Sequence, residues 1–228
     1  MIRTRTVYIT GASSGIGMAI AGRFVVDGDD VINLSRHKNP GVITNMVIDL
    51  TNEYDLFWMA KEFKKMPPDI LINCAGIMPL IYFPEMSRKE YEKIMTINTT
   101  APFLLCQAAI ANMKEGGIII NIASISGFYN DDPDLVAYNM SKAALLMLTR
   151  CLAKLYPQLN IISVSPGLTY PTNLVPGQKE LPPDLIEAVP KKRPASPEEI
   201  AELVFFLCSD KAKFITGANI VIDGGRSA

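Results

Sequence analysis

Histidine is almost absent from this chain of 228 residues, which contains only His37. One histidine cannot supply a catalytic zinc site or a Ser-His-Asp triad, so we expect no metal centre and look for acid–base chemistry in other side chains. Cysteine is scarce as well, and no two cysteines form a C-x-x-C pair. The apolar surroundings of Cys74, Cys106, Cys151 and Cys208 predict buried free thiols in a reducing compartment.

An excess of one charge and long apolar runs are also missing. The formal net charge is −1, so the whole chain has no electrostatic footprint for nucleic acid. No apolar run approaches the roughly 18 residues of a membrane span. A strand-like run begins at Val7, which leaves no room for a secretory signal. We therefore expect a cytoplasmic protein that binds neither nucleic acid nor membrane.

What the chain does contain is a regular alternation of strand-like and helix-like segments. Hydrophobic residues make up 49% of it, enough for a sheet covered by helices on both faces. Alternation with short connections predicts a doubly wound α/β fold, and solidly apolar strands suit a parallel sheet. The expected strands are Val7–Ile9, Val31–Leu34, Met46–Ile48, Ile70–Asn73, Ile118–Ile122, Ile161–Val164 and Asn219–Ile222, and the expected helices are Glu53–Lys65, Arg88–Met113, Asn139–Tyr156 and Pro197–Leu207.

A glycine-rich turn, Thr10-Gly11-Ala12-Ser13-Ser14-Gly15-Ile16-Gly17, follows the first strand and leads into a helical pattern. Gly11 can adopt a backbone conformation closed to other residues, Gly15 leaves room for a phosphate, and Gly17 allows close helix–strand packing. The helix start offers free N–H groups to an anion, and Ser13 and Ser14 add hydroxyls. The spacing differs from the common G-x-G-x-x-G, so a plain connecting turn is the alternative interpretation.

A tyrosine and a lysine at helical spacing form the second candidate site. Tyr138 and Lys142 stand at i and i+4, on one face of a helix. An ammonium close to a phenol stabilises the phenolate and lowers its pKa, so the pair suits proton transfer in a carbonyl–alcohol interconversion. A surface pair is the alternative. Ser124 follows a strand, where its hydroxyl could hold a substrate oxygen, and Asn98 places an amide in an apolar helical region.

In this order the motifs resemble those of the short-chain dehydrogenases/reductases, over nearly the whole chain from Val7 to Gly225. The resemblance implies one Rossmann-type domain over residues 1–228, with a mostly parallel seven-stranded sheet of order 3-2-1-4-5-6-7. It also implies a homotetramer, or a homodimer. The matching motifs are Thr10–Gly17, Asp49-Leu50, Asn73-Cys74-Ala75-Gly76, Asn98, Ser124, Tyr138-x-x-x-Lys142, Pro166-Gly167, Ile215-Thr216-Gly217-Ala218 and Asp223-Gly224-Gly225.

The resemblance implies roles for the matched residues. Tyr138 would be the general acid and base, Lys142 would hold the nicotinamide ribose and lower the tyrosine pKa, and Ser124 would orient the substrate. Asn98 would help to hold a water in a proton relay through its main chain. The cofactor-binding positions would be Gly11, Ser13, Ser14, Gly15, Ile16, Gly17, Ser35, Arg36, Asp49, Leu50, Asn73, Ala75, Gly76, Tyr138, Lys142, Pro166, Gly167, Thr169 and Thr172, with the choice between the two threonines open.

Charge at the end of the second strand predicts which cofactor is used. An acid there accepts hydrogen bonds from the adenosine ribose of NAD, but here the strand ends in the uncharged Ser35, followed by Arg36. A guanidinium attracts a 2′-phosphate, so the sequence favours NADP(H) over NAD(H). A solvated loop arginine is the alternative.

A proline-rich stretch at about residues 170–196 interrupts the alternation, at the sheet edge where ligands of such folds bind. We interpret it as a substrate lid. The leading substrate is a 3-oxoacyl thioester, and a sugar, polyol or small ketone is the alternative. Lys191-Lys192-Arg193 could approach an acidic carrier protein, although a solvated charge run is the simpler interpretation. From another class of function, the chain could be a non-catalytic NADP(H)-binding regulatory protein.

Overall fold

The computed structural model describes residues 4–41, 44–129, 133–172, 174 and 180–228. Its strands form the predicted sheet, seven-stranded and parallel, in the order β3-β2-β1-β4-β5-β6-β7. The strands are β1 (Thr6–Thr10), β2 (Asp30–Ser35), β3 (Thr44–Val47), β4 (Ile70–Asn73), β5 (Ile118–Ile122), β6 (Asn160–Pro166) and β7 (Asn219–Ile222). The α-helices are α1 (Gly15–Val26), α2 (Glu53–Lys65), α3 (Arg88–Met95), α4 (Ala101–Ile110), α5 (Val136–Leu155), α6 (Pro183–Glu187) and α7 (Pro197–Leu207).

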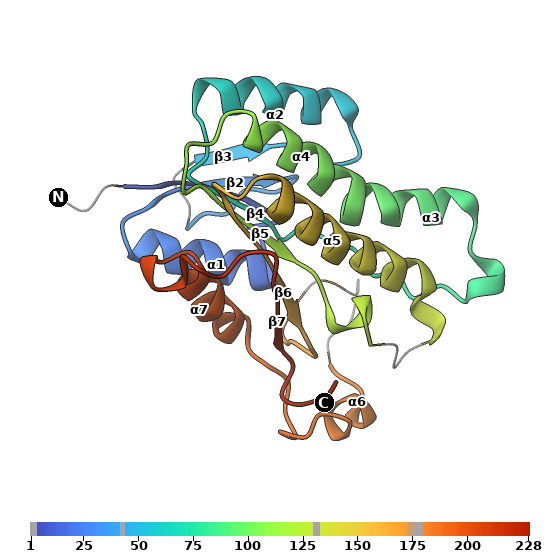
Figure 1. Cartoon of the computed structure of the whole chain (residues 1–228). Coiled ribbons are helices and arrows are strands. Elements are labelled where there is room, and N and C mark those ends of the chain that lie inside the picture. Colours follow the sequence, from blue (N-terminus) through green and yellow to red (C-terminus); the bar gives the residue numbers. More distant parts are fainter. Residues whose placement is uncertain (1–3, 42–43, 130–132, 173, 175–179) are drawn as a thin grey trace.

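Helices cover both faces of the sheet, with α1 and α7 on one face and α2, α4 and α5 on the other (Figure 1). Side chains of β1 alternate between two cores, as the period of a strand requires. Val7 and Ile9 pack in the core that includes Phe24 of α1. Tyr8 packs in the opposite core, edge-on to Phe63 of α2 with 4.8 Å between ring centroids. The expectation of a sheet buried on both faces is confirmed.

The predicted helix Arg88–Met113 is interrupted. A π-helical turn at Thr96–Thr100 separates α3 from α4, and it contains the buried Asn98. Single π-turns inside helices often occur at functional sites, because they redirect a side chain. The helix around Tyr138 begins at Val136, slightly earlier than expected, so the tyrosine lies within its first turn.

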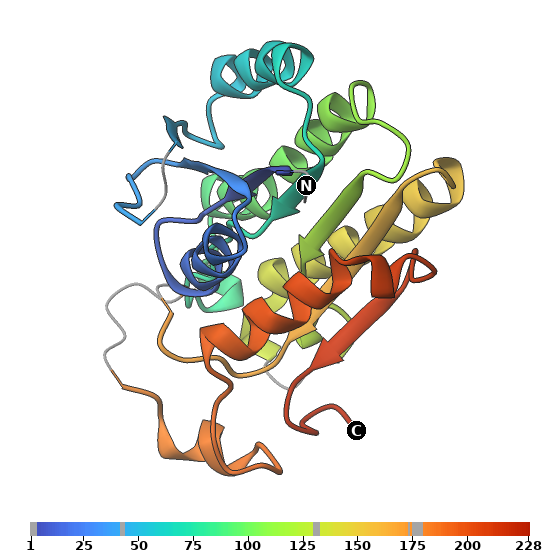
Figure 2. The same cartoon turned by 90° about the vertical axis from the view of Figure 1, so that its left-hand side faces the viewer.

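All parallel strands end at the same edge of the sheet, and this edge collects the predicted site residues. The glycine turn leaves β1 there, Cys74–Gly76 follow β4, Ser124 follows β5 and Gly167 follows β6. Figure 2 shows α6 standing away from the body of the molecule, and Arg226 near the C-terminus donates to the carbonyl of Leu185 in this helix at 3.2 Å. The edge therefore brings residues from the whole length of the chain into one region.

Within the described residues, no helix is both long and apolar enough to cross a membrane. The same residues contain no group of three His, Cys, Asp or Glu side chains suited to a metal ion. All four cysteines are free. Cys106 and Cys208 are buried and Cys74 is half-buried, but Cys151 is exposed, which corrects the expectation of four buried thiols. Its position on the outer face of α5 explains the difference, because the apolar residues there do not face the sheet.

Candidate active site

The glycine turn has the geometry that its sequence predicts. Gly11 and Gly15 have φ angles of +72° and +51°, in the left-handed region that favours glycine. A Cβ on Gly17 would collide with the carbonyl oxygen of Gly11, so only glycine lets α1 start this close to β1. The N-cap residue Ser14 makes no side-chain hydrogen bond to the first turn of α1. The turn and the helix start thus form a cradle of bare main chain with N–H groups available to an anion.

Thr10 joins this turn to the next loop of the edge. Its hydroxyl oxygen accepts hydrogen bonds from the main-chain N–H groups of Cys74 and Ala75, both at 3.0 Å. Asn73 points away from the edge, into the sheet, where its amide donates to Asn121 Oδ1 at 2.9 Å. Ala75 and Gly76 are therefore the residues of this motif that border the edge, whereas the side chain of Asn73 links β4 to β5.

Tyr138 and Lys142 lie on the face of α5 that is turned toward the sheet. Both side chains are buried, 5% and 3% exposed, and Lys142 Nζ lies 5.7 Å from the centroid of the Tyr138 ring. Lys142 Nζ also donates to the carbonyl oxygen of Ile122, at 2.9 Å, which anchors the ammonium at the end of β5. Ser124 lies two residues beyond the end of this strand and is itself buried. The alternative of a solvated surface pair is wrong.

Burial dominates the electrostatics of this pair. It raises the pKa of Tyr138 to about 12, against a smaller lowering by the hydrogen bond with Ser124. It also lowers the pKa of Lys142 to about 8. Lys142 is not among the causes of the shift at Tyr138, so the lowering of the Tyr138 pKa by Lys142 that the family resemblance implies stays a prediction. At neutral pH the phenol therefore keeps its proton.

Asn98 fixes this centre through its side chain. Its Oδ1 accepts from the N–H of Ile77 at 2.9 Å, and its Nδ2 donates to the carbonyl of Ile77 at 3.0 Å. Nδ2 also donates to the hydroxyl of Ser141 at 3.0 Å, and that hydroxyl donates to the carbonyl of Tyr138 at 2.7 Å. Asn98 and Ser141 are fully buried. The amide in an apolar helix thus has a structural reason, since it connects the loop after β4 to the helix that carries Tyr138.

Gly76 shows how tightly these groups converge. A Cβ on this residue would stand 3.4 Å from both Asn98 Oδ1 and Lys142 Nζ. Sequence reasoning missed Ser141 and Thr10 as site residues, although Ser141 stands inside the Tyr-x-x-Ser-Lys run. Their importance depends on partners distant in sequence, which spacing alone does not reveal.

The end of β2 carries the residues predicted to face an adenosine. Arg36 is exposed, and its charge contributes to lowering the pKa of Asp49, after the larger effect of hydrogen bonds from Thr51. Ser35 is half-exposed, and its hydroxyl lies 2.7 Å from the carbonyl oxygen of His37, to which it donates. The side chain of Leu50 is buried in the core, so only its main chain can border a ligand.

At the end of β6, Pro166 is buried and Gly167 packs against Asp223. A Cβ added to Gly167 would lie only 2.7 Å from the Cβ of Asp223. The hydroxyl of Thr169 donates to the carbonyl of Gly167 at 3.1 Å. Thr172 is half-buried, farther along the same segment. The hydroxyl proton of Thr169 is thus engaged in a hydrogen bond within this loop. Of the predicted lid, residues 173 and 175–179 lie outside the described residues.

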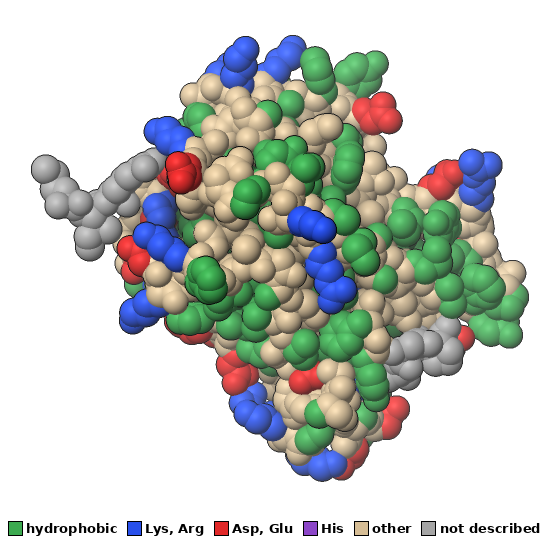
Figure 3. Space-filling model, viewed as in Figure 1, with side chains coloured by type: hydrophobic (Ala, Val, Ile, Leu, Met, Phe, Trp, Pro, Cys, Tyr) green, Lys and Arg blue, Asp and Glu red, His purple; other side chains and the backbone are tan. Residues whose placement is uncertain are grey.

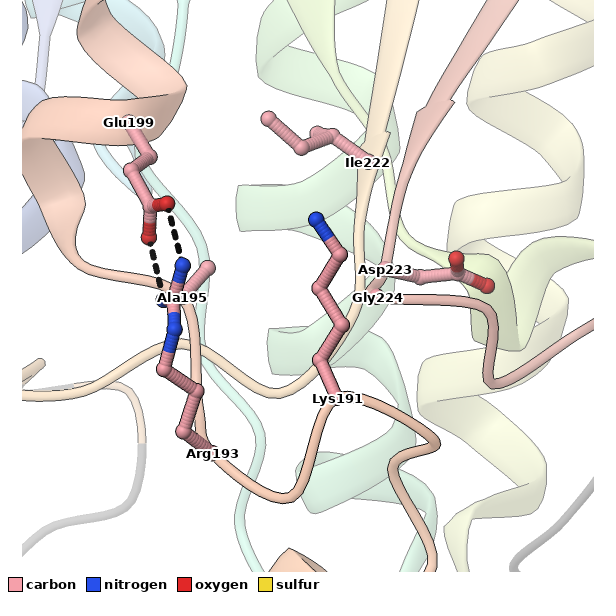
Figure 4. Close-up of a pocket in the computed structure, with 7 residues that line it drawn as sticks. All are labelled: Lys191, Arg193, Ala195, Glu199, Ile222, Asp223 and Gly224. Carbon is pink, nitrogen blue, oxygen red and sulfur yellow. Dashed lines mark hydrogen bonds and ion pairs between the residues drawn. The ribbon is translucent and has the colours of Figure 1, made fainter.

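Two hollows lie near these elements. The first, about 140 Å³, is lined by Lys191, Arg193, Ala195, Glu199, Ile222, Asp223 and Gly224, and Figure 4 shows Arg193 paired with both carboxylate oxygens of Glu199. Lys192 is paired with Glu187 at 3.2 Å. Two of the three cations of the run Lys191–Arg193 are thus engaged within the chain.

The second hollow, about 350 Å³, lies between the segment after Ser124 and α5. Its four lining residues on α5 are at positions i, i+3, i+4 and i+7 from Val136, so they share one side of the helix, turned away from Tyr138 and Lys142. The hollow is therefore lined by another side of α5 than the one that carries Tyr138 and Lys142. It is lined by Ser126, Gly127, Phe128, Tyr129, Val136, Asn139, Met140 and Ala143.

The described residues fit a nicotinamide dinucleotide. The main-chain cradle at Gly11–Gly17 suits a pyrophosphate, and the space over Gly76 that a Cβ would fill opens toward Lys142. Arg36 directly follows β2, and Tyr138 lies in the first turn of α5. The arrangement places an acid–base pair beside the expected position of the reacting ring.

Comparisons with known proteins agree with this arrangement. A family model described as enoyl-(acyl carrier protein) reductase matches residues 11–227. An uncharacterized oxidoreductase of Thermotoga maritima is 34% identical over 98% of this chain and 98% of its own length. An NAD-dependent glycerol dehydrogenase of Listeria innocua is 33% identical, over 98% and 94%. A 3-oxoacyl-(acyl-carrier-protein) reductase of Mycobacterium tuberculosis is 30% identical, over 97% and 92%.

Among solved structures, a short-chain dehydrogenase/reductase of Serratia marcescens superposes with a TM-score of 0.91 and 28% identity, covering 100% of this chain and 99% of that one. The match extends over the sheet, the glycine turn and the Tyr138–Lys142 helix alike. The chain therefore belongs to the short-chain dehydrogenase/reductase family and is an NAD(P)-dependent oxidoreductase.

Proposed function

We propose that this enzyme interconverts a carbonyl and an alcohol with NADP(H), and that Tyr138 is its general acid and base. The observation that carries the proposal is the burial of Tyr138 and Lys142 side by side at the carboxyl edge of the sheet, with Ser124 next to them. Bound NADP(H) supplies the hydride donor or acceptor. The protein supplies the orientation and the proton.

Each residue has one task in this proposal. The protonated phenol of Tyr138 donates to the oxygen of a carbonyl substrate, and Ser124 holds that oxygen in place. The ammonium of Lys142 binds the ribose next to the nicotinamide and favours the phenolate once the proton has left. The main chain at Asn98 holds a water that returns a proton toward Lys142. The anchoring of Asn98 to Ile77 supports this task, because it keeps that turn still.

The preference for NADP(H) rests on charge at the end of β2. Arg36 is exposed beside the uncharged Ser35, with Lys38 two residues on, so a 2′-phosphate meets cations and no carboxylate on this segment. The remaining cofactor contacts are proposed at the glycine turn, at Asp49, Leu50, Ala75 and Gly76, and at Pro166, Gly167 and either Thr169 or Thr172. The Listeria relative is named NAD-dependent, which makes this preference a property to measure.

A 3-oxoacyl thioester is the proposed substrate, and the mycobacterial relatives, named as reductases of that substrate class, support it. The glycerol dehydrogenase relative favours a polyol as the second candidate. A regulatory protein without turnover is disfavoured, because such a role does not require Tyr138 and Lys142 in a shared buried site. We also propose that the whole chain is one cytoplasmic catalytic domain, with residues 170–196 as the substrate lid.

A homotetramer, or a homodimer, is proposed from the outer face of α4 and α5. Phe103, Met140, Met147 and Leu155 are between 48% and 66% exposed there, next to the hollow of about 350 Å³. Figure 3 shows hydrophobic side chains over this side of the molecule and gathered on the lobe formed by residues 78–86 and α3. Burying such a face against a second copy removes apolar area from water. If light scattering at micromolar concentration gives the mass of a monomer, the proposed oligomer is refuted.

The function is tested by absorbance at 340 nm with NADPH and NADH against acetoacetyl thioesters, diketones, keto sugars and, in the reverse direction, glycerol. We expect NADPH oxidation with a carbonyl substrate, and a ratio of kcat/KM between NADPH and NADH that falls toward one in Arg36→Ala. Equal efficiency with both cofactors in the wild type refutes the NADP(H) preference. If the enzyme oxidises glycerol and reduces no thioester, the proposed thioester substrate is wrong and a polyol takes its place.

A further inference from the structure

The connection between β2 and β3 is unusually short. Parallel neighbours in a sheet are ordinarily joined by a crossover of a dozen or more residues, usually a helix. Here only residues 36–43 separate Ser35 from Thr44, and the described part of this connection, residues 36–41, contains no helix. This segment carries Arg36, the residue on which the cofactor preference depends. Something other than helix packing must hold it in place.

Three asparagines take over that task. Asn33 of β2 donates from Nδ2 to the carbonyl of His37 and to Asn45 Oδ1, both at 2.9 Å. Asn45 of β3 also accepts from the N–H of Asn39 at 2.7 Å and donates back to the carbonyl of Asn39 at 3.2 Å. The hydroxyl of Ser35 lies within hydrogen-bond distance of the His37 carbonyl as well, at 2.7 Å. The main chain on both sides of Lys38 is thus tied to the two strands.

Asn39 connects this loop to the glycine turn. Its Nδ2 donates to the carbonyl of Ala12 at 2.7 Å, and its Oδ1 accepts from the N–H of Gly41 at 2.9 Å. The side chain is only 4% exposed, although it lies on a surface loop with exposed neighbours. A buried amide with its donor and acceptor both engaged is a rigid link, because breaking either bond leaves a polar group without water. The link joins the loop of Arg36 to the cradle for the pyrophosphate.

We propose that Asn39 is a positioning residue for cofactor selectivity: it fixes the loop 36–41 against the glycine turn so that Arg36 meets an adenosine 2′-phosphate without a prior rearrangement. The inference rests on the proposed NADP(H) preference and adds its structural cause. Pre-organisation raises affinity by lowering the entropy lost on binding. Loss of Asn39 therefore weakens the contribution of the 2′-phosphate more than that of the rest of the nucleotide.

Isothermal titration calorimetry with adenosine 2′,5′-bisphosphate and with 5′-AMP separates these contributions, because the two probes differ only in the 2′-phosphate. The ratio of their dissociation constants measures the effect of that group. We expect Asn39→Ala to reduce the ratio by about threefold or more. Asn39→Leu, which keeps a similar size and loses the donor to Ala12 without adding a charge, should do the same. Neither probe contains nicotinamide, so the readout does not depend on turnover.

The matched control is Asn112→Ala. Asn112 also donates its amide to a main-chain carbonyl, that of Ala108 at 2.8 Å, but it lies at the far end of α4. This variant should leave the ratio unchanged. In an Arg36→Ala background, Asn39→Ala should cause no further fall of the ratio, because a positioning residue acts through the group that it positions.

Two failures are distinguishable. If the wild type binds both probes equally, the proposed NADP(H) preference is wrong. If the wild type favours the bisphosphate and both Asn39 variants keep the wild-type ratio, the preference stands and the positioning role is overturned. An equal loss of affinity for the two probes also overturns the positioning role, since Asn39 would then support the fold of this sheet edge and not the placement of Arg36.

Discussion

Replacing Lys142 by methionine should slow turnover strongly without a loss of stability at neutral pH. The ammonium of Lys142 is buried, and the fold lowers its pKa from 10.5 to about 8. Each unit of such a shift corresponds to about 1.4 kcal/mol, so keeping this side chain charged inside the protein costs about 3 kcal/mol below pH 8. Methionine removes that cost. It also leaves the carbonyl of Ile122 without its donor, at a cost of about 1–3 kcal/mol.

At pH 7 these contributions nearly cancel, and the free energy of unfolding of Lys142→Met should lie between the wild-type value and about 2 kcal/mol above it. The pH dependence is sharper. Between about 8 and 10.5 the unfolded chain binds a proton at Lys142 that the folded protein has released, so wild-type stability rises with pH through this contribution. The variant lacks the group, and its advantage should shrink by about 3 kcal/mol across that window.

The assay is urea unfolding followed by circular dichroism at pH 7 and at several values up to 10, with the wild type and Lys142→Met measured side by side. Lys154→Met, at the exposed end of the same helix, is the control substitution. Carbonyl reduction by Lys142→Met should fall by about 10²–10⁴-fold. A stability difference that is constant over this pH range would refute the reasoning, because it would mean that Lys142 is not held as a buried charge.

Three other predictions concern the same edge. Gly17→Ala should weaken binding of NADPH about tenfold or more, since the new methyl group collides with the carbonyl of Gly11 and must displace the cradle; fluorescence titration with unchanged affinity contradicts this. Ser141→Ala should lower kcat about tenfold with little change in KM, because Asn98 loses its link to the helix of Tyr138, and a rise in KM alone speaks against a positioning role. The rate of carbonyl reduction should fall as the pH rises through about 8, where Lys142 loses its proton, and a profile flat to pH 10 is inconsistent with the account.

Local patterns predicted much of the fold. The strands β4, β5 and β7 and the helices α2 and α7 lie where alternation and helical spacing placed them. Ser196 caps α7 with a reciprocal hydrogen-bond pair to Glu199. Each of these elements is specified by residues within a few positions of one another. The order of the sheet came from the family resemblance, and the structure confirms it.

Features that depend on distant partners were beyond the sequence. The π-turn at Asn98 interrupts a helical pattern that is continuous in sequence, because the amide of Asn98 binds Ile77 and Ser141. Asn39 looks like an ordinary turn residue before a proline until its partner at Ala12 is known. The rise in the pKa of Tyr138 was not predicted for a similar reason, since burial is a property of the packed molecule.

The most direct test of the central claim is a single-turnover measurement on enzyme loaded with NADPH and mixed with a carbonyl substrate, followed at 340 nm. Tyr138→Phe keeps the ring beside Lys142 and removes only the hydroxyl, and Tyr156→Phe at the far end of α5 is the matched control. The account predicts that Tyr138→Phe binds NADPH as the wild type does and oxidises it at least about a hundredfold more slowly, while Tyr156→Phe behaves as the wild type. A Tyr138→Phe enzyme that oxidises NADPH at the wild-type rate would contradict the role of Tyr138 as the proton donor.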